Sequence, residues 1–121
     1  MSDLEALAPR VIARCREAKV RLVLAEACTG GLIAAALTDV PGASAVVERS
    51  WADWGVAETG IAGPGGGTEQ KPVGLVFIAV QRRGQPAVVE RHLFTGDRRA
   101  VRQAAAARGL ALLLEQLAVE S

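Results

Sequence analysis

Two glycine-rich turns hold the residues of this chain that are best suited to chemistry. The first reads EACTGG over residues 26–31, and the second reads TGIAGPGGG over residues 59–67. Each turn follows an apolar run that is typical of a buried strand. Because glycine lacks a Cβ, such turns leave backbone amides bare and let a ligand approach the main chain closely. Two of these turns on neighbouring strands predict a cradle for a small anionic molecule.

The first turn places the amides of Thr29, Gly30 and Gly31 at the predicted start of a helix. Unpaired amides and the helix dipole make such a point a favourable site for a phosphate or carboxylate. The glycine spacing fits neither a Walker A loop nor the GxGxxG dinucleotide motif. A tight turn that needs glycine only for packing is an equally good interpretation of this turn alone.

The second turn adds side chains that can act on a ligand. Thr59 presents a hydroxyl at a strand end, and Lys71 follows the glycines. A lysine beside such a loop can bind phosphate, or act as a base if it is desolvated; a solvated loop charge is the alternative. Glu26 and Glu58 end the two strands, and each either binds a ligand hydroxyl, orients a donor or pairs with a neighbouring arginine.

Composition narrows the class of protein. The 121 residues suit one domain spanning 1–121, and the net charge of +1 without a basic stripe argues against nucleic-acid binding. Aromatic residues make up 3%, which argues against base-stacking platforms. The uncharged stretch 27–38 is too short to span a membrane, and no export signal is visible, so we expect a cytoplasmic protein. Cys15 and Cys28 lack CxxC spacing and are interpreted as small buried hydrophobes, and no metal or cofactor site is expected.

The elements that position the turns follow from periodicity and capping signals. We expect helices at 3–18, 29–38 and 98–118, the last capped by Asp97, and strands at 20–25, 43–49, 54–59, 73–80 and 87–94. The last two strands are expected to form an antiparallel hairpin, and His92 is expected at the surface. Strands that alternate with helices predict an α/β fold with a mostly parallel sheet, in which both glycine turns lie at the carboxyl ends of strands.

The same residues carry a family resemblance over nearly the whole chain, in collinear order. The chain resembles the C-terminal domain of the competence-damage-inducible protein CinA at residues 26–31, 39–44, 59–67, 71–74 and 94–98. Stand-alone versions of that domain are nicotinamide-nucleotide amidases. The resemblance implies a three-layer α/β/α sandwich that hydrolyses the carboxamide of nicotinamide mononucleotide to nicotinic acid mononucleotide and ammonia. It also implies a serine nucleophile in a Glu-Ser-Cys-Thr-Gly-Gly turn, activated by a lysine.

The chain departs from that pattern in two ways. Ala27 stands at the nucleophile position. The family also has a segment of a few dozen residues, carrying a Tyr and the activating Lys, where this chain runs from Ser50 directly into Trp51. Without a hydroxyl and a base, the acyl-enzyme route has no first step. We therefore expect an impaired amidase that still binds nicotinamide mononucleotide or a related phosphorylated molecule.

Two other readings stay open at this point: an active amidase that uses Thr59 or Cys28 with Lys71, and an oligomerising module with a vestigial pocket. Thr59 is the candidate catalytic residue. A homo-oligomer is expected, most plausibly a two-fold dimer with Trp51 and Trp54 between subunits, although a core role for one tryptophan fits as well. The candidate ligand-binding residues are Glu26, Cys28, Thr29, Gly30, Gly31, Gly60, Gly63, Gly65, Gly66, Lys71 and Arg98.

Overall fold

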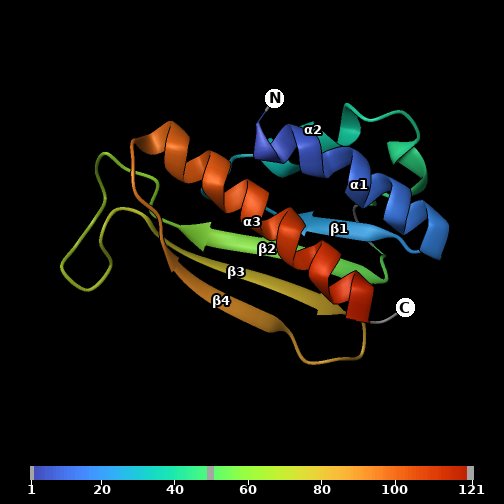
Figure 1. Cartoon of the computed structure of the whole chain (residues 1–121). Helices are drawn as coiled ribbons and strands as arrows, with labels where there is room; N and C mark the ends of the chain where they lie inside the picture. The colour runs from blue at the N-terminus through green and yellow to red at the C-terminus, as the bar shows by residue number, and fades with distance from the viewer. Residues whose placement is uncertain (1, 49–50, 120–121) are drawn as a thin grey trace.

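The computed structural model describes residues 2–48 and 51–119, and it combines one four-stranded sheet with three α-helices (Figure 1). The elements in chain order are α1 (Asp3–Ala18), β1 (Leu22–Ala25), α2 (Leu32–Thr38), the 3₁₀ turn η1 (Ala43–Ala45), β2 (Trp54–Gly60), β3 (Leu75–Arg82), β4 (Val88–Leu93) and α3 (Arg98–Val119). The predicted α/β class is confirmed.

Local signals explain where the long helices begin. Ser2 accepts from the Glu5 amide and Glu5 accepts from the Ser2 amide, which closes the capping box at the start of α1. At the start of α3, Asp97 accepts from the Ala100 amide, as predicted. No helix among the described residues is long and apolar enough to cross a membrane.

The sheet has the order β1-β2-β3-β4, and only its first pair is parallel. β2–β3 and β3–β4 are antiparallel, so the prediction of a mostly parallel sheet is wrong, whereas the predicted hairpin of β3 and β4 is confirmed. A parallel pair needs a crossover connection. The chain provides one between β1 and β2, which includes α2, but it joins β2 to β3 through the loop 61–74 without a helix.

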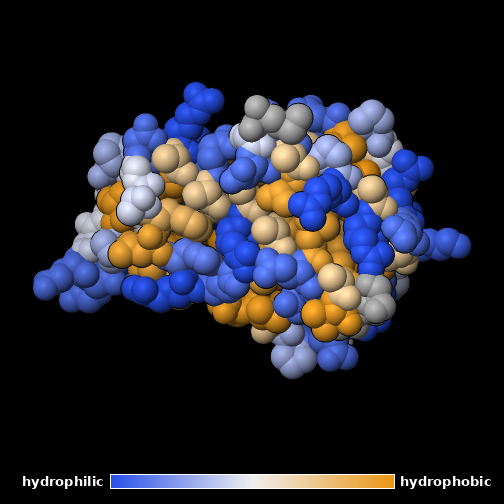
Figure 2. Space-filling view, in the orientation of Figure 1, coloured by the Kyte–Doolittle hydropathy of each residue, from blue (hydrophilic) through white to orange (hydrophobic). Residues whose placement is uncertain are grey.

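The described helices gather on one face of the sheet. A Cβ added at Gly109 of α3 would lie at van der Waals distance from Ile33 of α2 and from Val56 and Ile78 of the sheet, so α3 approaches both closely at this glycine. α1 packs against both other helices. The buried core lies between these layers and includes Val11, Ile12, Leu37, Val76, Val80, Leu110 and Leu113. Figure 2, in the orientation of Figure 1, shows this helix-bearing side as a mosaic of hydrophilic and hydrophobic residues.

No described helix covers the opposite face of the sheet, so the third layer of the expected sandwich is not part of the described structure. Side chains of Phe77, Val89 and Leu93 stay 40%, 61% and 56% exposed there. Only two residues separate Glu48 from Trp51 in this chain, at the junction where the family pattern has its additional segment.

Three other boundaries differ from the predictions for local reasons. The predicted strand at 43–49 is instead η1 followed by a single bridge between Val47 and Leu22, because Val46 and Val47 both donate to the carbonyl of Ala43; Arg49 lies outside the described residues. α2 begins at Leu32 rather than Thr29, because Gly30 and Gly31 have φ of 61° and 98°. β3 begins after Gly74, whose φ of 97° makes a turn.

Candidate functional site

The two glycine turns lie side by side at one edge of the sheet, as predicted. β1 and β2 are parallel neighbours with Leu22 opposite Trp54 and Ala25 opposite Ala57. Their carboxyl ends therefore meet, and the turns that follow them share this edge. In open sheets with helices, ligands bind at such edges.

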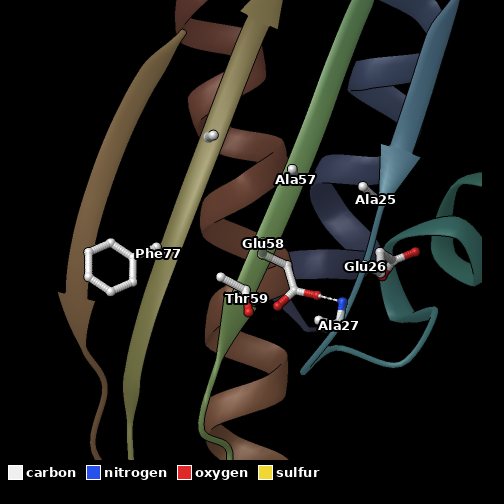
Figure 3. Close-up of a pocket in the computed structure, with 8 residues that line it drawn as sticks. Ala25, Glu26, Ala27, Ala57, Glu58, Thr59 and Phe77 are labelled. Atoms are coloured by element: carbon white, nitrogen blue, oxygen red, sulfur yellow. Dashed lines mark hydrogen bonds between the residues drawn. The ribbon is translucent and has the colours of Figure 1, made fainter. Parts of the chain in front are cut away.

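Glu58 is the central side chain of this edge. Its carboxylate accepts hydrogen bonds from the backbone amides of Ala27, Cys28 and Thr29, at 2.5, 3.1 and 3.2 Å. It also accepts from the Thr29 hydroxyl at 2.6 Å and from the Cys28 thiol at 2.8 Å. Figure 3 shows Glu58 reaching from β2 toward Ala27 at the end of β1. One carboxylate thus ties the first turn to the second strand.

The Glu58 side chain is only 5% exposed. Burial acts to raise its pKa, but the hydrogen bonds from Cys28 Sγ and from the Thr29 hydroxyl and the turn amides outweigh it and hold the pKa below its ordinary value. No lysine or arginine of the described residues forms an ion pair with this carboxylate. Oriented donors, rather than an opposite charge, therefore stabilise the buried anion.

This arrangement corrects the expectation of bare amides for two of the three amides singled out in the first turn, those of Thr29 and Gly30. The Thr29 amide donates to Glu58 and the Gly30 amide donates to the Ala27 carbonyl at 3.2 Å. The Thr29 side chain is fully buried and also faces protein acceptors. A ligand anion would have to compete with Glu58 for these donors.

Glu26 orients donors in the same way, which was one of the roles predicted for it. Its carboxylate accepts from the amides of Ile33 and Ala34 at 2.8 and 3.0 Å, and from the Thr29 hydroxyl at 2.8 Å. Glu26 therefore satisfies the first turn of α2 and compensates its dipole. The N-terminal amides of this helix are capped from within the chain.

Two arginines of α3 donate hydrogen bonds to the glycine turns, Arg102 to the first turn and Arg98 to the second. Arg98 donates to the Gly63 carbonyl at 2.9 Å, and Arg102 donates to the carbonyls of Cys28 and Thr29 at 3.1 and 2.9 Å. Arg102 also lies against Gly30, where an added Cβ would come within 3.0 Å of its guanidinium. Arg102 was missed from the sequence; its spacing of one helical turn from Arg98 was the available signal.

Two adjoining hollows open on the uncovered face next to the turns. One has a volume of about 320 Å³ and is lined by residues of all three neighbouring strands and the first turn: Ala25, Glu26, Ala27, Ala57, Glu58, Thr59, Phe77 and Ala79. Figure 3 shows most of these side chains. The other hollow, also about 320 Å³, is lined by Thr59, Gly60, Ile61, Lys71, Leu75 and Phe77. Thr59 and Phe77 line both hollows.

The structure therefore brings Thr59 and Lys71 to one hollow and Ala27 to the next. Gly60 is explained by packing, because an added Cβ would meet the Leu75 carbonyl at 2.5 Å. Gly63 is buried, whereas Gly65 and Gly66 lie exposed in the loop 61–74. Of the candidate ligand-binding residues, Glu26, Gly60 and Lys71 line these hollows, together with Thr59.

Cys28 is a poor nucleophile in this setting. Burial, followed by the hydrogen bond to Glu58 and its negative charge, raises the pKa of the thiol to about 12. The thiol is therefore protonated at neutral pH, and the thiolate is the reactive form. Cys15 is fully buried, and burial raises its pKa to about 11, in agreement with its predicted structural role.

Comparison with known proteins identifies the relatives of this chain. A model of the CinA C-terminal domain family matches residues 4–52 and 46–117. CinA-like proteins of Anaeromyxobacter sp. (strain Fw109-5) and Myxococcus xanthus (strain DK1622) are 37% and 36% identical, over 90% and 95% of this chain. The chain spans 37% of the length of each of these relatives.

The alignments also support the absence of an internal segment. The alignment with the Anaeromyxobacter protein runs over 151 residues, whereas this chain has 121 in total. The relative thus has additional residues inside the aligned region. The two pieces matched by the family model meet at residues 46–52, which is the junction singled out from the sequence.

Solved structures give the same family. The competence/damage-inducible protein CihA from Agrobacterium tumefaciens has a TM-score of 0.91 and 32% identity, covering 95% of this chain and 96% of that chain. A CinA superfamily protein from Klebsiella pneumoniae has a TM-score of 0.87 and 29% identity, covering 95% and 98%. With a family model matched along both halves and these neighbours in fold, the chain belongs to the CinA C-terminal domain family.

Proposed function

We propose that this chain binds a pyridine mononucleotide, such as nicotinamide mononucleotide, across the two hollows, and that it does not hydrolyse the carboxamide by the family's serine route. The observation that carries the proposal is the lining beside the first turn, where position 27 offers only a methyl group. The neighbouring thiol is protonated and bonded to Glu58, so it does not replace the missing hydroxyl.

The chemistry of the two hollows fits the two ends of such a ligand. Phe77 is 40% exposed at their shared wall and offers a ring face on which a pyridine ring can stack. Lys71 lines the second hollow and offers a positive charge for a phosphate. The two features are adjacent, which suits a molecule with an aromatic ring at one end and a phosphate at the other.

Binding and turnover on the same preparation test this function. We expect calorimetry to detect binding of nicotinamide mononucleotide, and a coupled assay to detect no ammonia release. Lys71→Ala should weaken binding, whereas Lys19→Asn should not. Lys19 has a φ of 58°, which asparagine tolerates, so this control removes an equal charge far from the hollows without backbone strain.

Absence of binding would contradict the proposal. Ammonia release that Thr59→Val abolishes would instead support an active amidase built on other residues, since Thr59 and Lys71 line one hollow.

A second candidate function is self-association, and one observation favours it. The open face of the sheet presents Phe77, Val89 and Leu93 to solvent, and relatives carry additional residues that this chain lacks. Exposed apolar surface of this kind marks sites of protein association. A second copy of the chain is the partner that we propose for this face.

A further inference from the structure

The donors around Glu58 converge in a way that no other carboxylate of the described residues shares. Three consecutive amides, of Ala27, Cys28 and Thr29, together with a hydroxyl and a thiol, all point at one carboxylate. Consecutive amides that converge on one point form a nest for an anion. The anion in this nest belongs to the chain itself.

The position of the nest relates it to amide hydrolysis. Backbone amides at and just after a nucleophile commonly hold the oxyanion that forms when the nucleophile attacks a carbonyl. Ala27 occupies the nucleophile position of the family pattern, and the amides in question are its own and those of the next two residues. Ala27 and Glu58 line the same hollow, so the nest borders the space proposed for the ligand.

We propose that the Glu58 carboxylate is an internal occupant of this nest, which makes the hollow beside it selective for a neutral carboxamide over a carboxylate. The nest donors are used by Glu58, so a ligand carboxylate finds no free donors there. It also meets a like charge at close range, which is unfavourable in a partly buried site. A carboxamide carries no charge and its NH₂ group can donate toward Glu58. The selectivity between the carboxamide and carboxylate nucleotides rests on the proposed function. The occupancy of the nest by Glu58 does not depend on it.

The first experiment tests occupancy without any nucleotide. Glu58→Ala removes the carboxylate, while Glu26 and Arg102 still contact the turn, and acetate has the size of the group removed. In an NMR titration, we expect acetate to bind Glu58→Ala at least about tenfold more tightly than wild type. The largest chemical-shift changes on acetate binding should be those of the Ala27, Cys28 and Thr29 amides. Glu69→Ala removes an equal charge from an exposed loop residue and should behave like wild type.

Equal acetate affinity in Glu58→Ala and wild type, or shifts located elsewhere, would overturn the proposal. Should Glu58→Ala fail to fold, the wild-type protein still carries the test. In NMR spectra of the wild type, the chemical shifts of the Ala27, Cys28 and Thr29 amides should change together, with one common midpoint, as the pH is lowered. The isosteric variant Glu58→Gln should show no such common change. Absence of a shared titration would refute the occupancy.

The second experiment compares two nucleotides that differ only in this group. Wild type should bind nicotinamide mononucleotide at least about tenfold more tightly than nicotinic acid mononucleotide, and Glu58→Gln should bring the ratio close to one. The same preference in both proteins would contradict the selectivity. If neither nucleotide binds any variant, the proposed function fails while the acetate experiment still decides whether the nest is occupied.

Discussion

At the scale of single residues, the first turn is held by side chains other than that of position 27. Glu58 and Arg102 contact its amides and carbonyls, and Glu26 accepts from the Thr29 hydroxyl. The turn is therefore held in place whether or not a nucleophile is present.

Restoring the hydroxyl alone should not restore turnover. Ala27→Ser supplies a nucleophile, but the segment that carries the family's lysine is absent and Glu58 occupies the neighbouring amides. We expect no ammonia release from nicotinamide mononucleotide above that of wild type, because an unactivated serine is a weak nucleophile. Appreciable turnover by this single variant would show that Lys71 or another group serves as the base.

Cys28 should resist alkylation in the folded protein. With a pKa of about 12, its thiolate fraction at pH 8 is far below that of an ordinary cysteine. We expect labelling by iodoacetamide to be at least about a hundredfold slower than in the urea-unfolded protein, and to accelerate as pH rises toward the pKa. Cys15→Ala provides a background with a single thiol. Labelling at the unfolded rate would mean that Cys28 does not face Glu58 in solution.

At the scale of elements, an ion-pair network joins the edge strand β4 to α3. Arg108 binds Glu90 through two hydrogen bonds of 2.7 and 2.8 Å and also reaches Glu115. The hydrogen bonds from Arg108 and His92 lower the pKa of Glu90 to about 2. The network contributes stability that depends on Glu90 being ionised.

Glu90→Gln should therefore lower the free energy of unfolding at neutral pH by about 1 kcal/mol, a value reduced for partial exposure. A carboxyl whose pKa is lowered on folding stabilises the protein above its ordinary pKa, here 4.5, and loses that contribution as pH falls toward about 2. The difference between wild type and variant in urea denaturation should shrink over this range. Glu115→Gln, a more exposed partner of the same arginine, should cost less.

The elements that could be predicted from sequence are those with strong local signals. The capping box at Ser2 and the cap at Asp97 located α1 and α3, and the apolar runs before the two glycine turns located β1 and β2. Sheet order and direction could not be predicted, because they depend on which connections cross over. Glu58 could not be recognised as the centre of the site, because its donors lie about thirty positions earlier in the chain and meet it only when β1 and β2 pair.

At the scale of the whole molecule, the described structure has two layers where the family resemblance implies three. The uncovered face of the sheet is therefore available for contact with a second copy of the chain. Trp54 is 5% exposed within the chain's own core, which fits the core role left open for one tryptophan. Trp51 is 63% exposed, and its ring centroid lies 3.9 Å from the Arg83 guanidinium, so only Trp51 is available for a contact between subunits. The open sheet face also exposes apolar side chains. Val89 and Leu93 lie on it along the edge strand β4, with the exposed Arg91 between them and opposite Phe77 of β3.

We predict that the chain forms a two-fold dimer through Val89 and Leu93 on the β4 side of this face, which leaves the hollows beside Thr59 and Phe77 open to a ligand. Sedimentation velocity at micromolar concentration should show the dimer for wild type. Val89→Lys and Leu93→Lys should shift it to monomer, because each replaces an apolar contact by a second positive charge next to Arg91 and so adds like-charge repulsion across the interface. Val119→Lys alters an apolar residue that is 76% exposed on α3 and should leave the dimer intact. A folded, soluble wild-type monomer would contradict the prediction and would mean that the open face is stable in water on a single chain.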